Sequence, residues 1–209
     1  MATGLLAVAF DSTGVAEDEF NDWYDTEHIP ERRRLSGFLA LQRWIGVDDH
    51  RLAVATYDLQ SLQVLEGAAY RAISGENLSP WSKRITGKCR RIMRFEGEQL
   101  TGESAAPADA AALLLVAMNV DPEWEQEFNR WYNEEHLPSL SALPGVLCAR
   151  RFRANTGPVK YLASYHLGSA DVCESPAWKK AVDTNWTRRM HAHVGDRLRI
   201  VARAYRRKG

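Results

Sequence analysis

The residues best suited to chemistry in this sequence are two histidines that occur in nearly identical segments. His28 lies in FNDWYDTEHIP at 20–30, and His136 lies in FNRWYNEEHLP at 128–138, an offset of 108 residues. Each is predicted to stand at a helix end, where the helix dipole favours the protonated imidazole and a burying pocket opposes it. That balance can hold an imidazole pKa near neutrality, as a general acid or base requires. The alternative is a structural histidine that ties the helix end to a neighbouring loop.

A tyrosine stands four residues before each histidine, at Tyr24 and Tyr132. Residues four apart share one face of a helix, so each phenol is expected close to its imidazole. Such a phenol could position or protonate an enolate-like oxygen of a bound carbonyl compound. The two histidines and the two tyrosines are therefore the predicted catalytic residues.

Other repeated residues are candidates for contact with a substrate. Trp23 and Trp131 are expected either to pack their helix onto a sheet or to form the wall of a pocket for a flat apolar ligand. Glu27 and Glu135 directly precede the histidines, but adjacent helical residues point about 100° apart, so the two side chains need not touch. A surface or capping acid is the alternative for both glutamates.

Arg43 and Arg151 occupy equivalent positions in two predicted strands. An arginine there could face a cavity and bind a carboxylate through two hydrogen bonds, and a strand-surface charge is the alternative. His191 and His193 form a His-x-His pair, which can ligate a metal when it lies on a strand. We expect this pair at a helix end or in a loop instead, and the first half has no counterpart, so no metal site is predicted.

Composition excludes several classes of partner. The chain has 209 residues, with 27 Lys and Arg against 27 Asp and Glu, so no large basic field is expected to attract nucleic acid. Cys89, Cys148 and Cys173 form no CxxC pair, which argues against a zinc site or a disulfide frame. No stretch approaches the ~18 apolar residues of a membrane span, and no signal peptide is recognised. A cytoplasmic protein without nucleic-acid or membrane partners is expected.

The pattern of apolar and turn residues predicts the order β-α-β-β-α-β in each half of the chain. The first half is expected to form strands over 5–10, 37–46, 51–58 and 88–96 and helices over 16–29 and 62–73, the second of them capped by Ser61. The second half is expected to form strands near 112–119, 145–153, 159–167 and 197–205 and helices near 122–137 and 176–191. Pro30 disfavours helical geometry at the residue before it, so the first helix is expected to end near residue 28 or 29.

This order predicts an α+β fold made of two ferredoxin-like units. The first unit would span 1–97 and the second 112–209, joined by a small, polar linker over 98–111. One such unit leaves an apolar sheet face uncovered, which a soluble protein rarely tolerates. Packing the two faces together would give an intramolecular dimeric α/β barrel.

The repeated pattern W-Y-x-x-E-H-[IL]-P, followed by a Gly-Phe or Gly-Val strand that ends in Arg-aromatic, resembles the EthD-like branch of the dimeric α/β-barrel superfamily. The resemblance covers nearly the whole chain as two tandem domains. The superfamily holds decarboxylases and lyases, polyketide cyclases, cofactor-free monooxygenases, heme-binding enzymes and members without known activity. The resemblance therefore implies the fold more firmly than the chemistry.

Our leading hypothesis from the sequence is a small lyase, cyclase or decarboxylase that needs no cofactor and acts on a hydrophobic carbonyl-containing small molecule. His28 or His136 would act as the base, and Tyr24 or Tyr132 would orient the substrate oxygen. One alternative is a non-catalytic ligand carrier or accessory protein of a degradation pathway. A further alternative is a heme- or oxygen-dependent enzyme. Two chains could also pair as a homodimer.

Overall fold

The computed structural model describes residues 3–207, and its centre is a closed barrel of antiparallel strands in the order β1-β3-β2-β8-β5-β7-β6-β4. The strands are β1 (Gly4–Asp11), β2 (Phe38–Gly46), β3 (Leu52–Leu59), β4 (Arg90–Gly102), β5 (Ala112–Val120), β6 (Val146–Ala154), β7 (Tyr161–Leu167) and β8 (Val194–Ala204). The four strands of each half of the chain are neighbours. The halves join where β2 pairs with β8 and where β4 pairs with β6.

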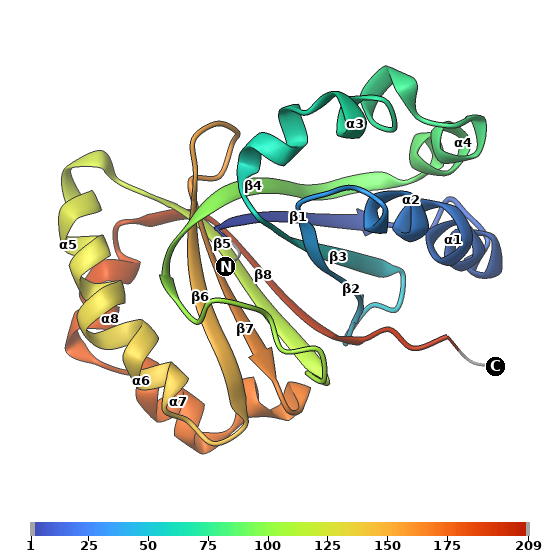
Figure 1. Cartoon of the computed structure of the whole chain (residues 1–209). Coiled ribbons are helices and arrows are strands. Elements are labelled where there is room, and N and C mark those ends of the chain that lie inside the picture. Colours follow the sequence, from blue (N-terminus) through green and yellow to red (C-terminus); the bar gives the residue numbers. More distant parts are fainter. Residues whose placement is uncertain (1–2, 208–209) are drawn as a thin grey trace.

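The helices cover the outside of the barrel on two opposite sides (Figure 1). On the first side lie α1 (Glu17–Trp23), the π-helix η1 (Tyr24–His28), α2 (Ile29–Arg33), η2 (Leu62–Glu66), α3 (Ala68–Arg71), η3 (Gly75–Asn77) and α4 (Pro80–Lys88). On the second side lie η4 (Pro122–Trp124), α5 (Glu125–Trp131), the π-helix η5 (Tyr132–His136), α6 (Leu137–Ser141), η6 (Ala170–Glu174), α7 (Pro176–Val182) and α8 (Asn185–His191).

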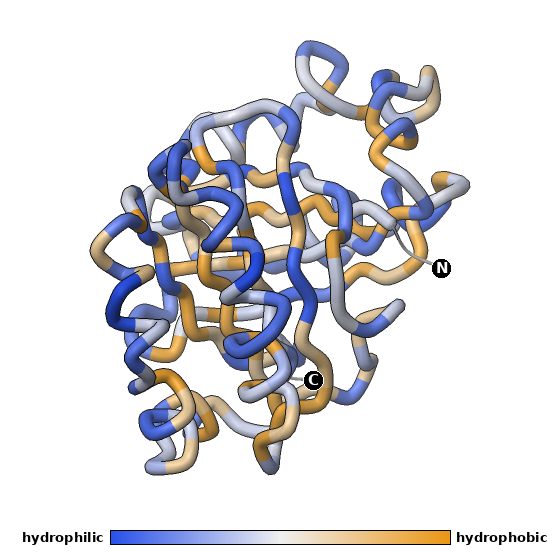
Figure 2. Tube along the Cα trace, turned by 90° about the vertical axis from the view of Figure 1, so that its left-hand side faces the viewer, coloured by the Kyte–Doolittle hydropathy of each residue, from blue (hydrophilic) through white to orange (hydrophobic). Residues whose placement is uncertain are grey.

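The protein has three apolar cores, one inside the barrel and one under each set of helices, because side chains alternate along the strands. Side chains at every second strand position point to the same face of a sheet. Leu5, Ala7 and Ala9 of β1 therefore pack inside the barrel, whereas Leu6 and Val8 face the first set of helices. The second set of helices packs on the opposite outer face in the same way. Figure 2 shows hydrophobic residues recurring along the barrel strands, whereas many surface loops are hydrophilic. The predicted dimeric α/β barrel is confirmed at this level.

A buried ion pair joins the two halves inside the barrel. Arg150 of β6 donates from Nη1 and Nη2 to the two carboxylate oxygens of Asp58 on β3, at 2.8 and 3.0 Å. The two side chains are 1% and 3% exposed. The backbone N–H of Ala106, in the segment between the halves, also donates to Asp58. The carboxylate of Asp58 therefore links the two halves of the chain and the segment that connects them.

The first predicted helix does not end at Pro30. The backbone N–H of Ile29 donates to the carbonyl of Tyr24, a π-helical hydrogen bond, and the chain continues into α2 up to Arg33. Pro30 stands at the start of α2, where a missing N–H is tolerated. The prediction failed because a π-turn before a proline lets the helix continue.

Two other predicted elements are placed differently by the structure. Ser61 makes no capping hydrogen bond and precedes a short 3-10 turn, whereas Ser79 caps α4 by accepting a hydrogen bond from the backbone N–H of Ser82. Residues 98–102 of the predicted linker continue β4 and pair with β6. The polar sequence there is compatible with a strand because its neighbour supplies the hydrogen bonds.

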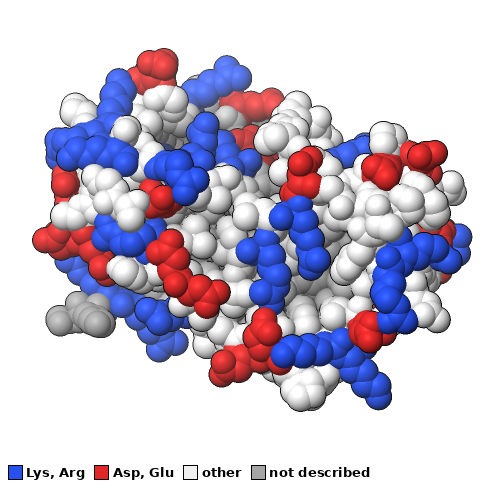
Figure 3. Space-filling model, turned by 180° about the vertical axis from the view of Figure 1, so that it is seen from behind, with Lys and Arg blue, Asp and Glu red and all other residues white. Residues whose placement is uncertain are grey.

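Charges are mixed over the surface. On the face shown in Figure 3, Lys and Arg are interspersed with Asp and Glu, in keeping with the balanced composition of the chain. No helix in the described part of the chain is long and apolar enough to cross a membrane.

Candidate functional site

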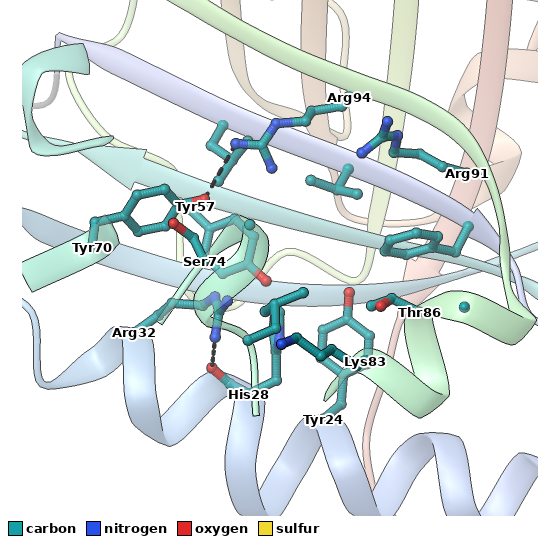
Figure 4. A pocket seen from close by; sticks show the side chains of 16 residues that line it. Tyr24, His28, Arg32, Tyr57, Tyr70, Ser74, Lys83, Thr86, Arg91 and Arg94 are labelled. Atoms are coloured by element: carbon teal, nitrogen blue, oxygen red, sulfur yellow. Dashed lines mark hydrogen bonds between the residues drawn. The ribbon is translucent and has the colours of Figure 1, made fainter. Parts of the chain in front are cut away.

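A cavity of about 700 Å³ lies between the outer face of the first-half sheet and the helices that cover it. Figure 4 shows side chains entering it from η1 and α2 on one side, from α4, and from β4 on the opposite side. The lining residues are Leu6, Val8, Phe10, Tyr24, His28, Arg32, Tyr57, Tyr70, Ser74, Gly75, Leu78, Lys83, Thr86, Gly87, Arg91 and Arg94. Both first-half residues of the predicted catalytic set are among them.

The π-turn of η1 places Tyr24 and His28 together in this cavity. The π-helical hydrogen bond from the N–H of Ile29 to the carbonyl of Tyr24 closes a turn that contains both residues. The two ring centroids are 5.0 Å apart, and the His28 ring also lies 4.5 Å from that of Trp23. π-Turns inside helices are frequent at functional sites. The second copy repeats the turn at η5, with a ring separation of 5.0 Å between Tyr132 and His136.

The other two residues of the motif hold helices together instead of facing the cavity. Trp23 Nε1 donates to Ser82 Oγ at 2.9 Å, and Glu27 accepts from the hydroxyls of Ser79 and Ser82 at 2.6 and 2.9 Å. These bonds hold the first turn of α4 against the helix formed by α1 and η1, which carries the repeated motif. The predicted contact of Trp23 and Glu27 with a substrate is therefore replaced by a packing role.

The second copy makes the equivalent contacts with threonine in place of serine. Trp131 Nε1 donates to Thr187 Oγ1 at 3.2 Å, and Glu135 accepts from Thr184 Oγ1 at 2.6 Å. Thr184 also caps α8. Glu135, like Glu27, is therefore a helix-docking residue, and the expected capping alternative describes both.

The environment of His28 keeps its imidazole neutral. Burial lowers the pKa of His28 well below its usual value, and nearby arginines, Arg32 foremost, lower it further. Arg32 is 4% exposed and donates to the carbonyl oxygen of His28 at 3.1 Å. No described side chain donates a hydrogen bond to either ring nitrogen, and Nδ1 is buried without a partner. The expected pKa near neutrality is therefore wrong for His28, because burial disfavours the charged ring. The neutral ring can still accept a proton from a bound molecule, but as a weaker base than an imidazole whose pKa lies near the working pH.

The two phenols beside His28, those of Tyr24 and Tyr57, keep their protons. Burial raises the pKa of Tyr24 to about 12, although Arg43 acts to lower it. Burial and the adjacent Tyr24 phenol raise the pKa of Tyr57 well above its usual value. Both hydroxyls point into the cavity (Figure 4), and that of Tyr57 has no hydrogen-bond partner among the described residues. They are protonated at neutral pH and can donate to an oxyanion.

Arg43 does not face this cavity as predicted. Its guanidinium is paired with Asp25 at 2.5 Å and lies between two rings, 4.4 Å from the centroid of Tyr24 and 3.8 Å from that of Tyr205. The hydroxyl of Tyr205 in turn donates to Asp25 at 3.1 Å. Arg43 therefore packs against the ring of Tyr24, and Tyr205 near the C-terminal end packs against the other side of the guanidinium.

Arg151, the predicted counterpart of Arg43, does not line the equivalent cavity of the second half. It is 1% exposed, and its guanidinium lies over the rings of Phe128, Tyr132 and Tyr161. None of its side-chain nitrogens has a hydrogen-bond partner among the described residues. Burial lowers the pKa of Arg151, although the neighbouring tyrosines act to raise it.

A smaller cavity of about 220 Å³ occupies the equivalent place in the second half. Trp131, Tyr132 and His136 line it, together with His191 at the end of α8. Burial lowers the pKa of His136 to about 3, with His191 next in effect. The two copies of the motif thus lie at cavities of unequal size, which the sequence left undecided.

Several lining residues of the large cavity were missed by the sequence analysis. Tyr57 has a repeated partner, Tyr165, at the same offset of 108 residues, and this was the available signal for it. Arg91 also has a repeated partner, Arg199, at this offset, whereas Lys83 and Arg94 have none. They reach the cavity only because α4 and β4 border it. His193 stacks on Trp124 at 3.8 Å, and the described residues hold no group of three or more His, Cys, Asp or Glu arranged for a metal ion.

The fold is shared with solved structures of low sequence identity. A structure described as an anthrone oxidase-like protein matches with a TM-score of 0.64 and 14% identity, over 99% of this chain and 94% of that chain. A proposed monooxygenase from Fusobacterium nucleatum matches with a TM-score of 0.64 and 11% identity, over 98% and 94%. A mutant chlorite dismutase from Candidatus Nitrospira defluvii, in complex with cyanide, matches with a TM-score of 0.64 and 10% identity, over 98% and 91%. No protein-family model matches the sequence, and no curated protein matches it significantly.

These structures correct the leading expectation of function. The sequence suggested a lyase, cyclase or decarboxylase, and that expectation is wrong because the similar structures are described as monooxygenases, an oxidase-like protein and chlorite dismutases. They agree better with the further alternative, a heme- or oxygen-dependent enzyme. The error arose because a paired imidazole and phenol serve proton transfer in many reaction classes, and the motif does not distinguish among them.

Matches of this length extend over both halves of the chain, and the strand order closes one barrel from them. The chain therefore has the dimeric α/β-barrel fold of these monooxygenase-type and chlorite dismutase structures, with all of the barrel strands supplied by one polypeptide.

Proposed function

We propose that this protein oxidises an anthrone-type aromatic ketone with dioxygen in the first-half cavity. The observation that carries the proposal is a neutral His28 beside two protonated phenols, Tyr24 and Tyr57, in a cavity lined by aromatic and aliphatic side chains. An anthrone has an acidic CH₂ group in conjugation with a carbonyl, so it offers a proton to remove and an oxygen to stabilise. The likeness to an anthrone oxidase-like structure supports this substrate type.

The first step assigned to the protein is proton transfer. His28 removes one proton from the CH₂ group, and the negative charge spreads onto the carbonyl oxygen. The phenols of Tyr24 and Tyr57 donate hydrogen bonds to that oxygen, as oxyanion-stabilising groups do. The positive charge of Arg32, which lowers the pKa of His28, also favours the anion once it has formed.

The remaining steps use dioxygen as the oxidant. The carbanion transfers one electron to dioxygen, and recombination forms a carbon–oxygen bond that becomes a hydroperoxide on taking up the first proton. Loss of the second C–H proton breaks the O–O bond, leaving a carbonyl and releasing water. One dioxygen is consumed for each anthrone converted to anthraquinone and water.

The test is an aerobic assay with 1,8-dihydroxyanthrone near pH 6.5, where its spontaneous oxidation is slow, followed by quinone absorbance and oxygen uptake. We expect His28→Ala to lower the rate by about 10²–10⁴-fold, the usual contribution of a general base. His136→Ala is the matched control and should leave the rate within about twofold. An unaccelerated reaction in the wild type, or a His28→Ala variant as fast as the wild type, would contradict the proposal.

A second candidate is a heme-dependent enzyme, favoured by the chlorite dismutase structures and by the free ring nitrogens of His28. The residues of the large cavity fit this group: His28 would ligate the iron, and Lys83 and Arg91 would pair with the propionates. Heme would supply redox-active iron for oxygen chemistry. Titration of the purified protein with hemin tests this. A Soret shift that His28→Ala abolishes would favour heme, and no shift would reject it.

We also propose that the chain arose by tandem duplication of one EthD-like unit, with units over 1–97 and 112–209. The support is the repeated motif and the equivalent docking contacts of Trp23 with Ser82 and of Trp131 with Thr187. A related protein of half this length that forms the barrel as a homodimer would support the duplication. If half-length relatives instead fold without the barrel, the idea is wrong.

A further inference from the structure

The charged side chains that line the large cavity are all of one sign. Its lining includes Arg32, Lys83, Arg91 and Arg94 but no aspartate or glutamate. Lys and Arg balance Asp and Glu over the whole chain, and the two signs mix on its surface in Figure 3. The excess of positive side chains is therefore a property of this cavity and does not follow from the composition of the chain. A cleft lined by one sign of charge raises the local concentration of oppositely charged ligands.

Two of these cations are committed to the protein itself. Arg32 is buried and bonds to Glu31 and to the backbone carbonyls of His28 and Ile73. Arg94 is paired with Glu96 and donates to the Tyr70 hydroxyl at 3.2 Å. Their paired glutamates offset much of their charge, and few of their donors are left for a ligand.

The other two cations are free to bind one. Lys83 on α4 and Arg91 on β4 are exposed and have no carboxylate partner among the described residues. They enter the cavity from two elements, α4 and β4, and neither element is the helix that carries Tyr24 and His28 (Figure 4). An arginine can bind a carboxylate through two parallel hydrogen bonds, and an ammonium can add a third.

We propose that the substrate is an anion: a flat aromatic ketone whose carboxylate is bound by Arg91 and Lys83 at the mouth of the cavity while its reacting carbon faces His28. This inference rests on the proposed oxidation for the identity of the reacting end. The carboxylate contact orients the ring system, because Arg91 lies at β4, across the cavity from Tyr24 and His28 on η1 (Figure 4). The same cations favour the second negative charge that develops on proton removal.

The experiment measures binding without turnover. Anthraquinone-2-carboxylate and its neutral carboxamide, which cannot be oxidised in this reaction, are titrated into the full-length protein by calorimetry at 50 mM and 300 mM NaCl. We expect the carboxylate to bind about tenfold or more tightly than the amide, and the difference to shrink at the higher salt. Arg91→Gln and Lys83→Gln should each weaken carboxylate binding several-fold and leave amide binding unchanged.

The matched control is Arg84→Gln, which removes a cation from the next position on α4, where Arg84 is 53% exposed and lies 3.4 Å from Glu19. It should leave both affinities unchanged. Equal affinities for acid and amide, no binding of either, or a preference that survives removal of both Arg91 and Lys83 would overturn the inference. A carboxylate preference without any anthrone oxidation would instead reject the proposed function and leave the anion site standing.

Discussion

Replacing Asp58 by asparagine should destabilise the whole barrel. Asp58 is the acceptor for both Nη atoms of Arg150, and both side chains are essentially excluded from solvent. The variant keeps the shape of the side chain but leaves the guanidinium charge buried without a counter-charge. Breaking a buried pair in this way costs about 3–5 kcal/mol. For a domain of this size, about 1 kcal/mol corresponds to roughly 2–4 °C, so Tm should fall by about 6–20 °C.

The assay is urea and thermal unfolding followed by circular dichroism, with Arg188→Gln as control. Arg188 and Asp183 form an exposed pair, 58% and 70% exposed, so its loss should cost less than about 1 kcal/mol. The double substitution Asp58→Leu with Arg150→Leu removes both charges but also the acceptor of the Ala106 N–H, so it should recover only part of the lost stability. An Asp58→Asn variant within about 1 kcal/mol of the wild type, or a double variant less stable than Asp58→Asn, would refute the argument.

Three further outcomes are expected. Burial lowers the pKa of His136 and of His166 to about 3, so below pH ~6.5 the unfolded chain binds a proton at each that the folded chain does not. The stability from these neutral imidazoles is therefore present above pH ~6.5 and falls as pH drops, by up to about 1.4 kcal/mol per pH unit for each histidine. His28, whose pKa burial also lowers, adds to the slope in the same direction. Urea titrations between pH 7.5 and 5 should show this slope, and His166→Gln should reduce it by about a third. Glu27→Ala removes the acceptor for two serine hydroxyls and should cost about 1–3 kcal/mol in chemical unfolding, with a smaller loss in the Gln variant. Gly145→Ala should cost about 1–3 kcal/mol by the same measurement, because its φ is +86° and an added Cβ would lie 2.7 Å from Val172 Cγ2. Gly168→Ala is the control and should cost less, because its Cβ would lie 3.7 Å from the nearest atom, the carbonyl oxygen of Gly145.

The repeat made the fold accessible from the sequence. A motif that recurs at an offset of 108 residues, within the same order of strands and helices, predicts two equivalent units, and an uncovered apolar sheet face predicts that they pack together. The boundaries were less accessible. Pro30 is an ordinary helix stop in a sequence, and only the π-turn before it lets the helix continue to Arg33.

The roles within the motif could not be separated in the same way. Trp23, Tyr24, Glu27 and His28 follow a common helical spacing, and each was a candidate for contact with a substrate. The three-dimensional arrangement divides them. Trp23 and Glu27 dock the start of α4, whereas Tyr24 and His28 face the cavity. A difference of one residue on a helix turns a side chain by about 100°, so the neighbouring element decides which face is which.

The sequence by itself determined the barrel and the presence of an imidazole and a phenol at equivalent positions in each half, because periodic patterns are local properties of the chain. Only the tertiary structure decided that the first copy faces a cavity of about 700 Å³ and the second one of about 220 Å³. It also brought Lys83 and Arg91 to the same cavity as His28. The physical reason is that cavity size and local charge depend on how residues distant in sequence pack around the motif, and no spacing within the motif records that packing.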